Sequence, residues 1–582
     1  MSKDLAESVA MIHKFLKQQG YGDSAKALRR DFKKMFDEED FSVSNGHSSG
    51  SNGRRVKRKG SFSSQFRKKS KGSDFNDTFD DDDDEGVFET KRGGIPIQTK
   101  LFIGGKFVES ASGRTFETVN PADGSVICDV DWAQKGDVNA AVRAARKAFP
   151  SWSTTTGPYR RDLLLKLADL MEKHKERLAE VEALDSGKPY QVALNLDLVL
   201  TIKCYRYYAG WADKIMGETM PIEGKYLCYT RKEPIGVCGQ ITPWNFPLLM
   251  QAWKLAPALA VGCTIVHKSS EKTPLTALMV GYLIREAGFP AGVVNILSGD
   301  GPITGEAISR HPKIDKVAFT GSTGVGRLIM KAAAETNLKK VTLELGGKSP
   351  LIVCDDADVD QAVAAGQLGL FINSGQCCIA SGRIYVQDGV YDEYVRKAVK
   401  FAKKRKLVDP MEDGHKDILA IQGPQVDKMQ FDRVMKYIKD GKREGARLCC
   451  GGARGSSNGY YIQPTIFADV EEHMKVAREE IFGPVMVIMR FSSLEEAIKR
   501  ANKSEFGLGA GIMTKDTAKA LATAHKLNAG TVYVNCYNVF DASAPFGGTK
   551  TSGIGRELGP YGLQNYYELK TVIVETGSAK FD

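Results

Sequence analysis

Short apolar runs alternate with amphipathic stretches between about residues 235 and 346. After the runs IGVCGQI, CTIVHKS, VVNILSG and KVAFTGS, apolar residues recur at helical spacing from about residues 247, 274, 302 and 323, and KVTLELG ends the series. Apolar strands separated by helices are typical of parallel sheets covered on both faces. The pattern therefore predicts an α/β fold built on a doubly wound parallel sheet.

The preceding part of the chain predicts further elements. Gly104 and Gly105 interrupt the run KLFIGGKFV and predict a β-hairpin that turns at these two residues. Residues 137–149 and 158–183 carry apolar side chains at helical spacing and predict two helices. The folded body of the chain is therefore expected to begin near residue 95.

Residues 1–41 have the pattern of two short helices. Ile12, Phe15 and Leu16 follow helical spacing, QQGYG interrupts the helix, and a second helix begins near Ser24. The segment IHKFLKQQGYGDSAKALRRD resembles a LisH motif, a small helical dimerisation element, which implies self-association through a second copy or binding to a protein partner. The alternative is an amphipathic extension that docks on the rest of the chain.

Residues 42–94 are expected to form a disordered, charged linker, because Ser, Gly and Asn dominate and few apolar residues are present for a core. The basic residues, including RRVKRK, come first, and an acidic block that includes DDDDDE follows. RRVKRK is typical of nuclear-localisation or nucleic-acid-binding segments. The acidic block lies close enough along the chain to neutralise the basic residues. The favoured interpretation is therefore a solvated linker whose basic and acidic parts attract each other.

Composition bounds the class of protein. A chain of 582 residues is too long for one ordinary core, so two or three domains are expected. The formal net charge of +10 arises from acidic and basic residues that are mixed through the body of the chain. This distribution favours a solvated surface over a nucleic-acid footprint, so no nucleic-acid partner is expected.

The cysteines and the start of the chain indicate the compartment. Eleven cysteines with no CxxC motif favour reduced thiols over a disulfide framework or a zinc site, so no metal is predicted. No apolar run approaches the roughly 20 residues that span a bilayer. The first residues, MSKDLAESV, include Asp4 and Glu7 and are unlike a signal or transit peptide. A cytoplasmic protein without membrane association is expected.

Two stretches of the sequence contain candidate catalytic residues. Glu344 closes the strand-like part of VTLELGGKSP, and Cys378 lies in FINSGQCCIASGR. A thiol becomes a strong nucleophile when its thiolate is favoured, and a carboxylate beside two glycines has room to activate water. Taken alone, a free cysteine is more often a packed and inert residue.

Together the two stretches resemble the signatures of the aldehyde dehydrogenase superfamily, of its NAD-dependent class 1 and class 2 type. Phe371, Gly375, Gln376 and Cys378 match the cysteine signature, which assigns the nucleophile to Cys378 and leaves the preceding cysteine as its neighbour. The resemblance covers about residues 95–582, and its further matches are TPWNFP, FTGSTGVG, EEIFGPV, VNCYNVF and PFGG.

The resemblance implies a division into domains. Residues 95–215 and 235–346 would form the NAD-binding domain, and residues 347–565 the α/β catalytic domain. Family members of this type form dimers or tetramers, so residues 216–234 and 566–582 are expected to form a β-arm that joins a homo-oligomer, with a tetramer favoured.

A glycine-rich segment follows the run KVAFT at the start of a predicted helix, where backbone N–H groups can approach a phosphate. Its spacing, GxxGxG, differs from the usual dinucleotide fingerprint, and glycines there also suit a tight turn. The resemblance implies NAD as cofactor, and a carboxylate at Glu271 would accept from a ribose 2′-hydroxyl but repel a 2′-phosphate. The residues that the resemblance assigns to NAD are Trp244, Lys268, Glu271, Gly321, Ser322, Glu480 and Phe482.

The resemblance also implies the reaction, which is oxidation of an aldehyde to a carboxylic acid. Cys378 would add to the aldehyde carbonyl, and the Asn245 amide with the Cys378 backbone N–H would hold the oxyanion. After hydride transfer to NAD, Glu344 would activate the water that hydrolyses the thioester. From the residues alone, Asn245 is also explained as a turn residue before Pro247.

The remaining assignments concern the substrate. Matching positions line a tunnel in the resembling enzymes, and apolar aliphatic or aromatic aldehydes are then favoured. Aromatic residues at these positions are also explained as plain core. The alternatives are a betaine-aldehyde or semialdehyde dehydrogenase, or a scaffold protein that has recruited an aldehyde dehydrogenase body. The tunnel positions are Leu200, Phe246, Trp253, Phe540 and Phe546.

Overall fold

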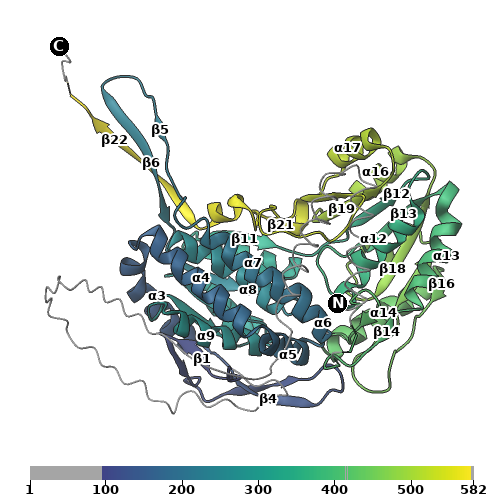
Figure 1. The fold of residues 1–582 in the computed structure, drawn as a ribbon, viewed down its shortest axis with the longest axis horizontal. Coiled ribbons are helices and arrows are strands. Elements are labelled where there is room, and N and C mark those ends of the chain that lie inside the picture. The colour runs from purple at the N-terminus through teal and green to yellow at the C-terminus, as the bar shows by residue number, and fades with distance from the viewer. Residues whose placement is uncertain (1–94, 413, 416, 578–582) are drawn as a thin grey trace, which may run out of the picture. The chain divides into compact units, whose positions relative to one another are not determined.

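The structure is a computed structural model that describes residues 95–412, 414–415 and 417–577 (Figure 1). The predicted LisH-like segment 1–41 and the predicted linker 42–94 lie outside the described residues, as does the end of the predicted arm. The described part of the chain contains one eight-stranded sheet, one seven-stranded sheet and three smaller sheets.

The eight-stranded sheet contains the predicted apolar strands in the order β2-β1-β9-β8-β7-β10-β11-β21. The strands from β9 to β11 in this order are parallel, so the predicted doubly wound sheet is confirmed. The hairpin at Gly104 and Gly105 is also present, since β1 and β2 pair across it. The strands are β1 (Leu101–Ile103), β2 (Lys106–Val108), β7 (Val237–Ile241), β8 (Thr264–Lys268), β9 (Val294–Leu297), β10 (Lys316–Thr320), β11 (Lys340–Glu344) and β21 (Gly553–Ile554).

Two layers of helices cover the faces of this sheet. Val266 packs in one core with α3, α10 and α11, whereas its neighbour Ile265 packs in the other core with α4, α7, α8 and α9. Successive side chains of a strand point to opposite faces of the sheet, so one strand packs against both layers of helices. The helices are α3 (Lys135–Ser153), α4 (Gly157–Lys173), α5 (Lys175–Ser186), α6 (Tyr190–Val192), η2 (Ala193–Asp197), α7 (Leu198–Ala209), α8 (Pro247–Val261), α9 (Leu275–Ala287), η3 (Gly301–Gly305), α10 (Glu306–Arg310) and α11 (Thr323–Ala334).

The helix predicted over residues 158–183 is two helices, and this part of the prediction is wrong. His174, with φ −103° and ψ 17°, leaves the helical region between α4 and α5. The apolar spacing continues across the break because both helices bury side chains in the same core. Periodicity alone therefore did not reveal the interruption.

The seven-stranded sheet has the order β16-β17-β18-β13-β12-β19-β20, and only the edge strand β16 is antiparallel to its neighbour. Its strands are β12 (Pro350–Val353), β13 (Arg383–Gln387), β16 (Arg447–Cys450), β17 (Thr465–Ala468), β18 (Val485–Phe491), β19 (Gly509–Met513) and β20 (Thr531–Val534). The helices of this region are α12 (Val359–Phe371), η4 (Ile372–Gly375), η5 (Asp388–Val390), α13 (Tyr391–Ala402), α14 (Lys428–Arg443), α15 (Lys475–Arg478), α16 (Leu494–Asn502), α17 (Thr517–Lys526), η6 (Lys550–Ser552) and η7 (Pro560–Asn565).

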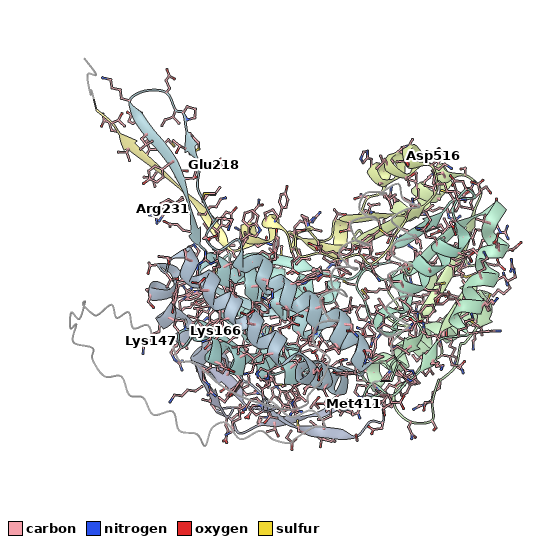
Figure 2. All side chains as sticks on the ribbon, in the orientation of Figure 1. Lys147, Lys166, Glu218, Arg231, Met411 and Asp516 are labelled. Carbon is pink, nitrogen blue, oxygen red and sulfur yellow. The ribbon has the colours of Figure 1, made fainter. Side chains whose placement is uncertain are left out.

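A three-stranded antiparallel arm has the order β22-β6-β5, with β5 at Thr219–Met220, β6 at Tyr226–Pro234 and β22 at Tyr567–Glu575. All nine residues of β22 pair with β6, and Figure 1 shows these strands side by side. Glu218 and Arg231, labelled in Figure 2, belong to this arm. The arm therefore joins the two segments that the sequence assigned to one element.

The remaining strands form two small sheets. β3 (Thr115–Val119) pairs with β4 (Val126–Asp131), and β14 (Lys406–Leu407) pairs with β15 (Ile421–Gln422). Within residues 95–577 as described, no helix is long and apolar enough to cross a membrane. The same residues contain no group of three or more His, Cys, Asp or Glu side chains that could hold a metal ion.

Candidate active site

The loop that carries the candidate nucleophile is strongly constrained. Asn373 and Ser374 have left-handed backbone conformations, with φ 48° and 57°, and such residues persist only where their surroundings hold them. The Ser374 hydroxyl donates to the Gly423 carbonyl at 2.9 Å, and Gln425 Nε2 donates to the Ser374 carbonyl at 3.1 Å. The turn after α12 is therefore fixed from a distant part of the chain.

Exposure separates the two adjacent cysteines of this loop. Cys377 is buried, with 4% of its surface exposed, whereas Cys378 is partly exposed. The pKa of Cys378 lies well above its usual value because of its hydrogen bond with Cys377, its burial and the charge of Glu344. A raised pKa favours the thiol form, so reaction of this side chain as a thiolate would need a base to accept its proton.

Glu344 supplies a base at this position. It ends β11, is buried, and its carboxyl interacts with the Cys378 thiol. Its Oε2 accepts from the Thr320 hydroxyl at 3.1 Å, and its Oε1 has no hydrogen-bond partner. Burial, followed by the charge of Glu557, raises the pKa of Glu344 to about 7. A carboxyl with this pKa can both accept and release a proton near neutral pH.

A buried polar chain continues from Glu344, and the sequence analysis missed two of its members. Lys254 Nζ donates to the Thr320 hydroxyl at 2.7 Å and lies 2.7 Å from Glu557 Oε1. Lys254 is the one charged residue in the apolar sequence of α8, and this lone charge was a signal available in the sequence. In the structure its side chain is fully buried. Glu557 follows 303 residues later and gave no such signal. Together these residues connect the Glu344 carboxyl to a partly buried carboxylate.

Asn245 follows β7 and lies beside the cysteine loop. Its Nδ2 donates to the Gln376 carbonyl at 3.0 Å, two residues before the nucleophile, and its Oδ1 has no hydrogen-bond partner. Its backbone carbonyl accepts from Asn373 Nδ2 at 2.7 Å and from Lys188 Nζ at 3.1 Å. An amide Nδ2 carries two hydrogens, so the second remains suited to an oxyanion near Cys378.

The candidate cofactor crevice lies where the strand order reverses, between β7 and β10. At the end of β10, the Gly321 N–H donates to the Glu344 carbonyl at 3.0 Å, and the Ser322 side chain caps α11 by accepting from the Val325 N–H. A Cβ on Gly324 would meet no atom within 4 Å. Open backbone at the start of a twelve-residue helix fits a pyrophosphate.

Lys268 and Glu271 lie at the end of the neighbouring strand β8. Lys268 Nζ donates to the carbonyls of Ser269 and Gly299 at 2.7 and 2.5 Å, and lies 3.6 Å from the Glu271 carboxylate. Burial lowers the pKa of Lys268. The Glu271 side chain is 41% exposed, so its oxygens can receive the hydroxyls of a sugar.

Glu480, Phe482 and Trp244 come together from the two large domains. Glu480 Oε1 accepts from the Gly347 N–H at 3.0 Å, and burial raises the pKa of its carboxyl to about 7. The Phe482 ring lies 5.3 Å from the Trp244 ring at 87°. The structure thus brings a residue that follows β7 against the segment before β18, as a site between the two sheets requires.

The predicted tunnel residues fall into two groups. Trp253, Phe540 and Phe546 form one aromatic cluster with centroid distances of 5.3, 5.6 and 6.1 Å. Phe246 instead lies against Lys188, whose Nζ is 3.9 Å from the ring centroid. Leu200, on α7, is partly buried and packs against the same hydrophobic core as the aromatic residues.

Comparison with known proteins agrees with this geometry. The sequence profile described as "Aldehyde dehydrogenase family" matches residues 107–572. The chain is 54% identical over 479 residues to mitochondrial aldehyde dehydrogenase of Homo sapiens, covering 82% of this chain and 92% of that protein. It is also 54% identical over 480 residues to retinaldehyde dehydrogenase 3 of Mus musculus, with coverage of 82% and 93%.

A solved structure has the same fold. The NAD+ complex of aldehyde dehydrogenase from Bacillus cereus is 52% identical, superposes with a TM-score of 0.80, and covers 82% of this chain and 96% of its own. Both sequence and fold are therefore shared over most of either protein. The chain belongs to the aldehyde dehydrogenase family.

Proposed function

We propose that this protein oxidises an aldehyde to a carboxylic acid with NAD as cofactor, using Cys378 as nucleophile and Glu344 as general base. The observation that carries the proposal is the interaction of the Glu344 carboxyl with the Cys378 thiol at the carboxyl edge of the first sheet. The named Bacillus relative was solved with NAD+, which supports the choice of cofactor.

In the first half-reaction, Glu344 accepts the thiol proton and the Cys378 sulfur adds to the aldehyde carbon. The carbonyl oxygen becomes an oxyanion, which Asn245 Nδ2 and the Cys378 backbone N–H stabilise. When bound, NAD supplies the acceptor for the hydride that leaves the former aldehyde carbon. The Cys378 sulfur then carries the acyl group as a thioester.

In the second half-reaction, Glu344 accepts a proton from water, and the resulting hydroxide adds to the thioester carbon. The carbon–sulfur bond breaks, the carboxylic acid leaves, and the sulfur recovers its proton. The hydrogen-bonded path from Glu344 through Thr320 and Lys254 to Glu557 can remove the surplus proton. This path allows Glu344 to act once in each half-reaction.

The residues that would hold NAD surround the crevice. The backbone at Gly321 and Ser322, just before α11, fits the pyrophosphate. Lys268 and Glu271 fit the adenosine ribose, and Glu480 fits the nicotinamide ribose. A carboxylate at Glu271 repels a 2′-phosphate, so NAD is preferred over NADP. Phe482 and Trp244 border the same crevice.

The substrate proposed is an apolar aliphatic or aromatic aldehyde. The cluster of Trp253, Phe540 and Phe546 supports this choice, because its aromatic surface offers no charge to pair with an acidic substrate. A betaine-aldehyde or semialdehyde dehydrogenase is the alternative. Comparing rates on charged and neutral aldehydes distinguishes them, since kcat/KM should be higher for neutral aldehydes.

The assembly and the compartment are also proposals. Exposed apolar side chains on the arm, such as Leu569 and Ile573, support a homo-oligomer, with a tetramer expected. All cysteines in the described residues are free thiols, which supports a reducing compartment such as the cytoplasm. Self-association through residues 1–41 remains a separate hypothesis about the full chain.

Replacing the nucleophile tests the proposal. Cys378→Ala should abolish NADH formation from a neutral aldehyde while leaving NAD binding intact, because the thiol takes part only in the chemical step. Absorbance of NADH and calorimetric titration with NAD provide the two measurements. Cys449→Ala, at a partly exposed cysteine on β16, is the matched control. Full turnover by Cys378→Ala would refute the assignment. A wild-type protein that forms no NADH with any aldehyde would instead favour the scaffold alternative.

A further inference from the structure

Lys188 contacts Asn245 and Phe246, two adjacent residues of the segment between β7 and α8. It comes directly after Gly187, whose left-handed conformation ends α5, and its ammonium is fully buried. Lys188 Nζ donates to the Asn245 carbonyl at 3.1 Å and lies 3.9 Å from the centroid of the Phe246 ring. One cation therefore holds the backbone of a proposed oxyanion donor and the ring of a proposed tunnel residue.

Asp197 anchors this cation from the opposite side. The carboxylate pairs with Lys188 Nζ, is fully buried, and ends the π-helical segment η2. Leu200 follows on the next turn, in α7. π-Helical turns inside helices occur frequently at functional sites, because they redirect a side chain that a regular helix would place elsewhere. Here the irregular turn directs the Asp197 carboxylate at the Lys188 ammonium, which in turn contacts Asn245.

Glu182 completes the buried cluster. Its oxygens accept from the Thr276 hydroxyl at 2.6 Å and from the Leu248 N–H at 3.3 Å, in the first turn of α8. Burial is the main cause that raises the pKa of Glu182 to about 7, while the charge of Lys188 lowers it and that of Asp197 raises it. The Lys188 ammonium is thus held by the Asp197 carboxylate and the Asn245 carbonyl, with the Glu182 carboxyl close enough for its charge to interact.

The Asn245 carbonyl has two fixed donors, Lys188 Nζ and Asn373 Nδ2. A peptide group is planar, so holding its carbonyl oxygen fixes the orientation of the chain on both sides. The side chain of Asn245 points to the cysteine loop on one side, and Phe246 begins α8 on the other. A displacement of about 1 Å in such a group lowers reaction rates on the order of 100-fold.

A buried ion pair is an inefficient way to stabilise a fold, because apolar side chains of similar size are often as stable. Its directional bonds can instead fix one geometry. We propose that Lys188 is a positioning residue that sets the Asn245 side-chain amide at the oxyanion of the Cys378 reaction and sets Phe246 at the tunnel wall. This inference rests on the proposed roles of Cys378 and Asn245.

The test compares two reactions of the same thiol. p-Nitrophenyl acetate acylates Cys378: the thiol proton passes to Glu344, a carbon–sulfur bond forms through an oxyanion, and p-nitrophenolate leaves. Iodoacetamide alkylates Cys378 by displacing iodide and forms no oxyanion. A loss of oxyanion positioning should therefore slow acylation but not alkylation.

The main variant is Lys188→Met with Asp197→Asn, which removes the cation and the charge of its partner together. Acylation should fall about 10-fold to 100-fold, and alkylation should change less than about 2-fold. Lys188→Gln with Asp197→Asn keeps an N–H donor for the Asn245 carbonyl and should recover part of the rate. Asp197→Asn alone, which changes one atom, should shift acylation in the same direction if the double variants do not fold.

Two further variants make the outcome decisive. Lys316→Met removes another fully buried ammonium, at the start of β10, and should leave acylation near the wild-type rate. In an Asn245→Ala background, the Lys188→Met and Asp197→Asn changes should have little further effect on acylation, because both act through one amide. Equal losses in acylation and alkylation, or independent losses in the Asn245→Ala background, would overturn the inference. Acylation that persists in Cys378→Ala would instead overturn the proposed function.

Discussion

Glu344 illustrates how a single residue acquires its chemistry from burial. A carboxyl with an ordinary pKa would be too weak a base for a thiol whose own pKa is raised. Burial in the first sheet brings the Glu344 pKa to about 7, while the Thr320 hydroxyl holds one of its oxygens at 3.1 Å. The other oxygen stays unpartnered and available to the thiol or to water.

The first prediction at this scale concerns the pH dependence of the reaction. Glu344 acts only as a carboxylate, so the rate of thioester hydrolysis should rise with pH and level off above pH 7 or so. Glu344→Gln should remove this dependence, slow product release on the order of 100-fold and let acylated enzyme accumulate. Stopped-flow kinetics with mass spectrometry of the enzyme measure both effects, and rapid deacylation by Glu344→Gln would contradict the role.

The same pKa makes a prediction about stability. Since the folded-state pKa of Glu344 lies above the ordinary carboxyl value of 4.5, its favourable contribution is present at low pH and is lost as pH rises through about 7. Glu344→Gln cannot ionise, so its thermal midpoint should exceed that of wild type by a margin that grows as pH rises from 4.5 to about 7, the interval that the shift spans.

Glu496 is the control for that measurement, because its pKa is shifted in the opposite direction. The Ser492 N–H lowers its pKa, so its carboxylate stabilises the fold at high pH and loses this effect as pH falls. Glu496→Gln should therefore lower the thermal midpoint most at high pH. If both variants shifted the midpoint in the same direction with pH, the assignment of a raised pKa to Glu344 would be wrong.

Among the elements, the turn after β11 contacts both Glu480, proposed to bind the cofactor, and Cys378, the proposed nucleophile. A Cβ on Gly346 would lie 2.5 Å from Glu480 Oε2, and a Cβ on Gly347 would lie 2.4 Å from the Cys378 carbonyl oxygen. The Gly347 N–H also holds Glu480 Oε1 at 3.0 Å. The two glycines therefore let the proposed general base Glu344, the loop that carries Cys378 and the Glu480 carboxylate share one small volume.

Gly346→Ala is expected to push the Glu480 carboxylate away from the crevice. Loss of a hydrogen bond to a charged group is worth about 1.5–3 kcal/mol, so KM for NAD should rise about 10-fold or more. Alkylation of Cys378 should change little. Gly136→Ala, at a glycine of α3 where an added Cβ meets no atom within 4 Å, is the control. Unchanged KM for NAD would remove Glu480 from the cofactor site.

At the scale of the whole molecule, the arm exposes several large apolar side chains. Leu569, Ile573 and Val574 on β22 are 62%, 59% and 44% exposed, and Tyr226 and Leu227 on β6 are 47% and 44% exposed. Apolar side chains gathered on two neighbouring strands of a three-stranded arm are typical of a surface that another copy covers.

Introducing charge on this arm should weaken the assembly. Leu569→Asp with Ile573→Asp places two carboxylates on one face of β22, and the mass measured by light scattering should fall toward that of a smaller species. Val126→Asp, at an apolar position on β4 that is 52% exposed, is the control and should leave the mass unchanged. A wild-type mass retained by the arm variant would contradict this use of β22.

Local patterns along the chain were enough to predict the doubly wound sheet and its strands, because buried parallel strands require continuous apolar runs. The signatures around Glu344 and Cys378 are contiguous, so the sequence could nominate these residues, and their roles stay predictions. Only the tertiary structure decided the break at His174, the raised pKa of Cys378, and the contacts of Lys188 and Lys254. These depend on segments that approach in space, as Lys254 and Glu557 do across 303 residues. Burial and charge interactions fall off over a few ångströms, so no spacing in the sequence records them.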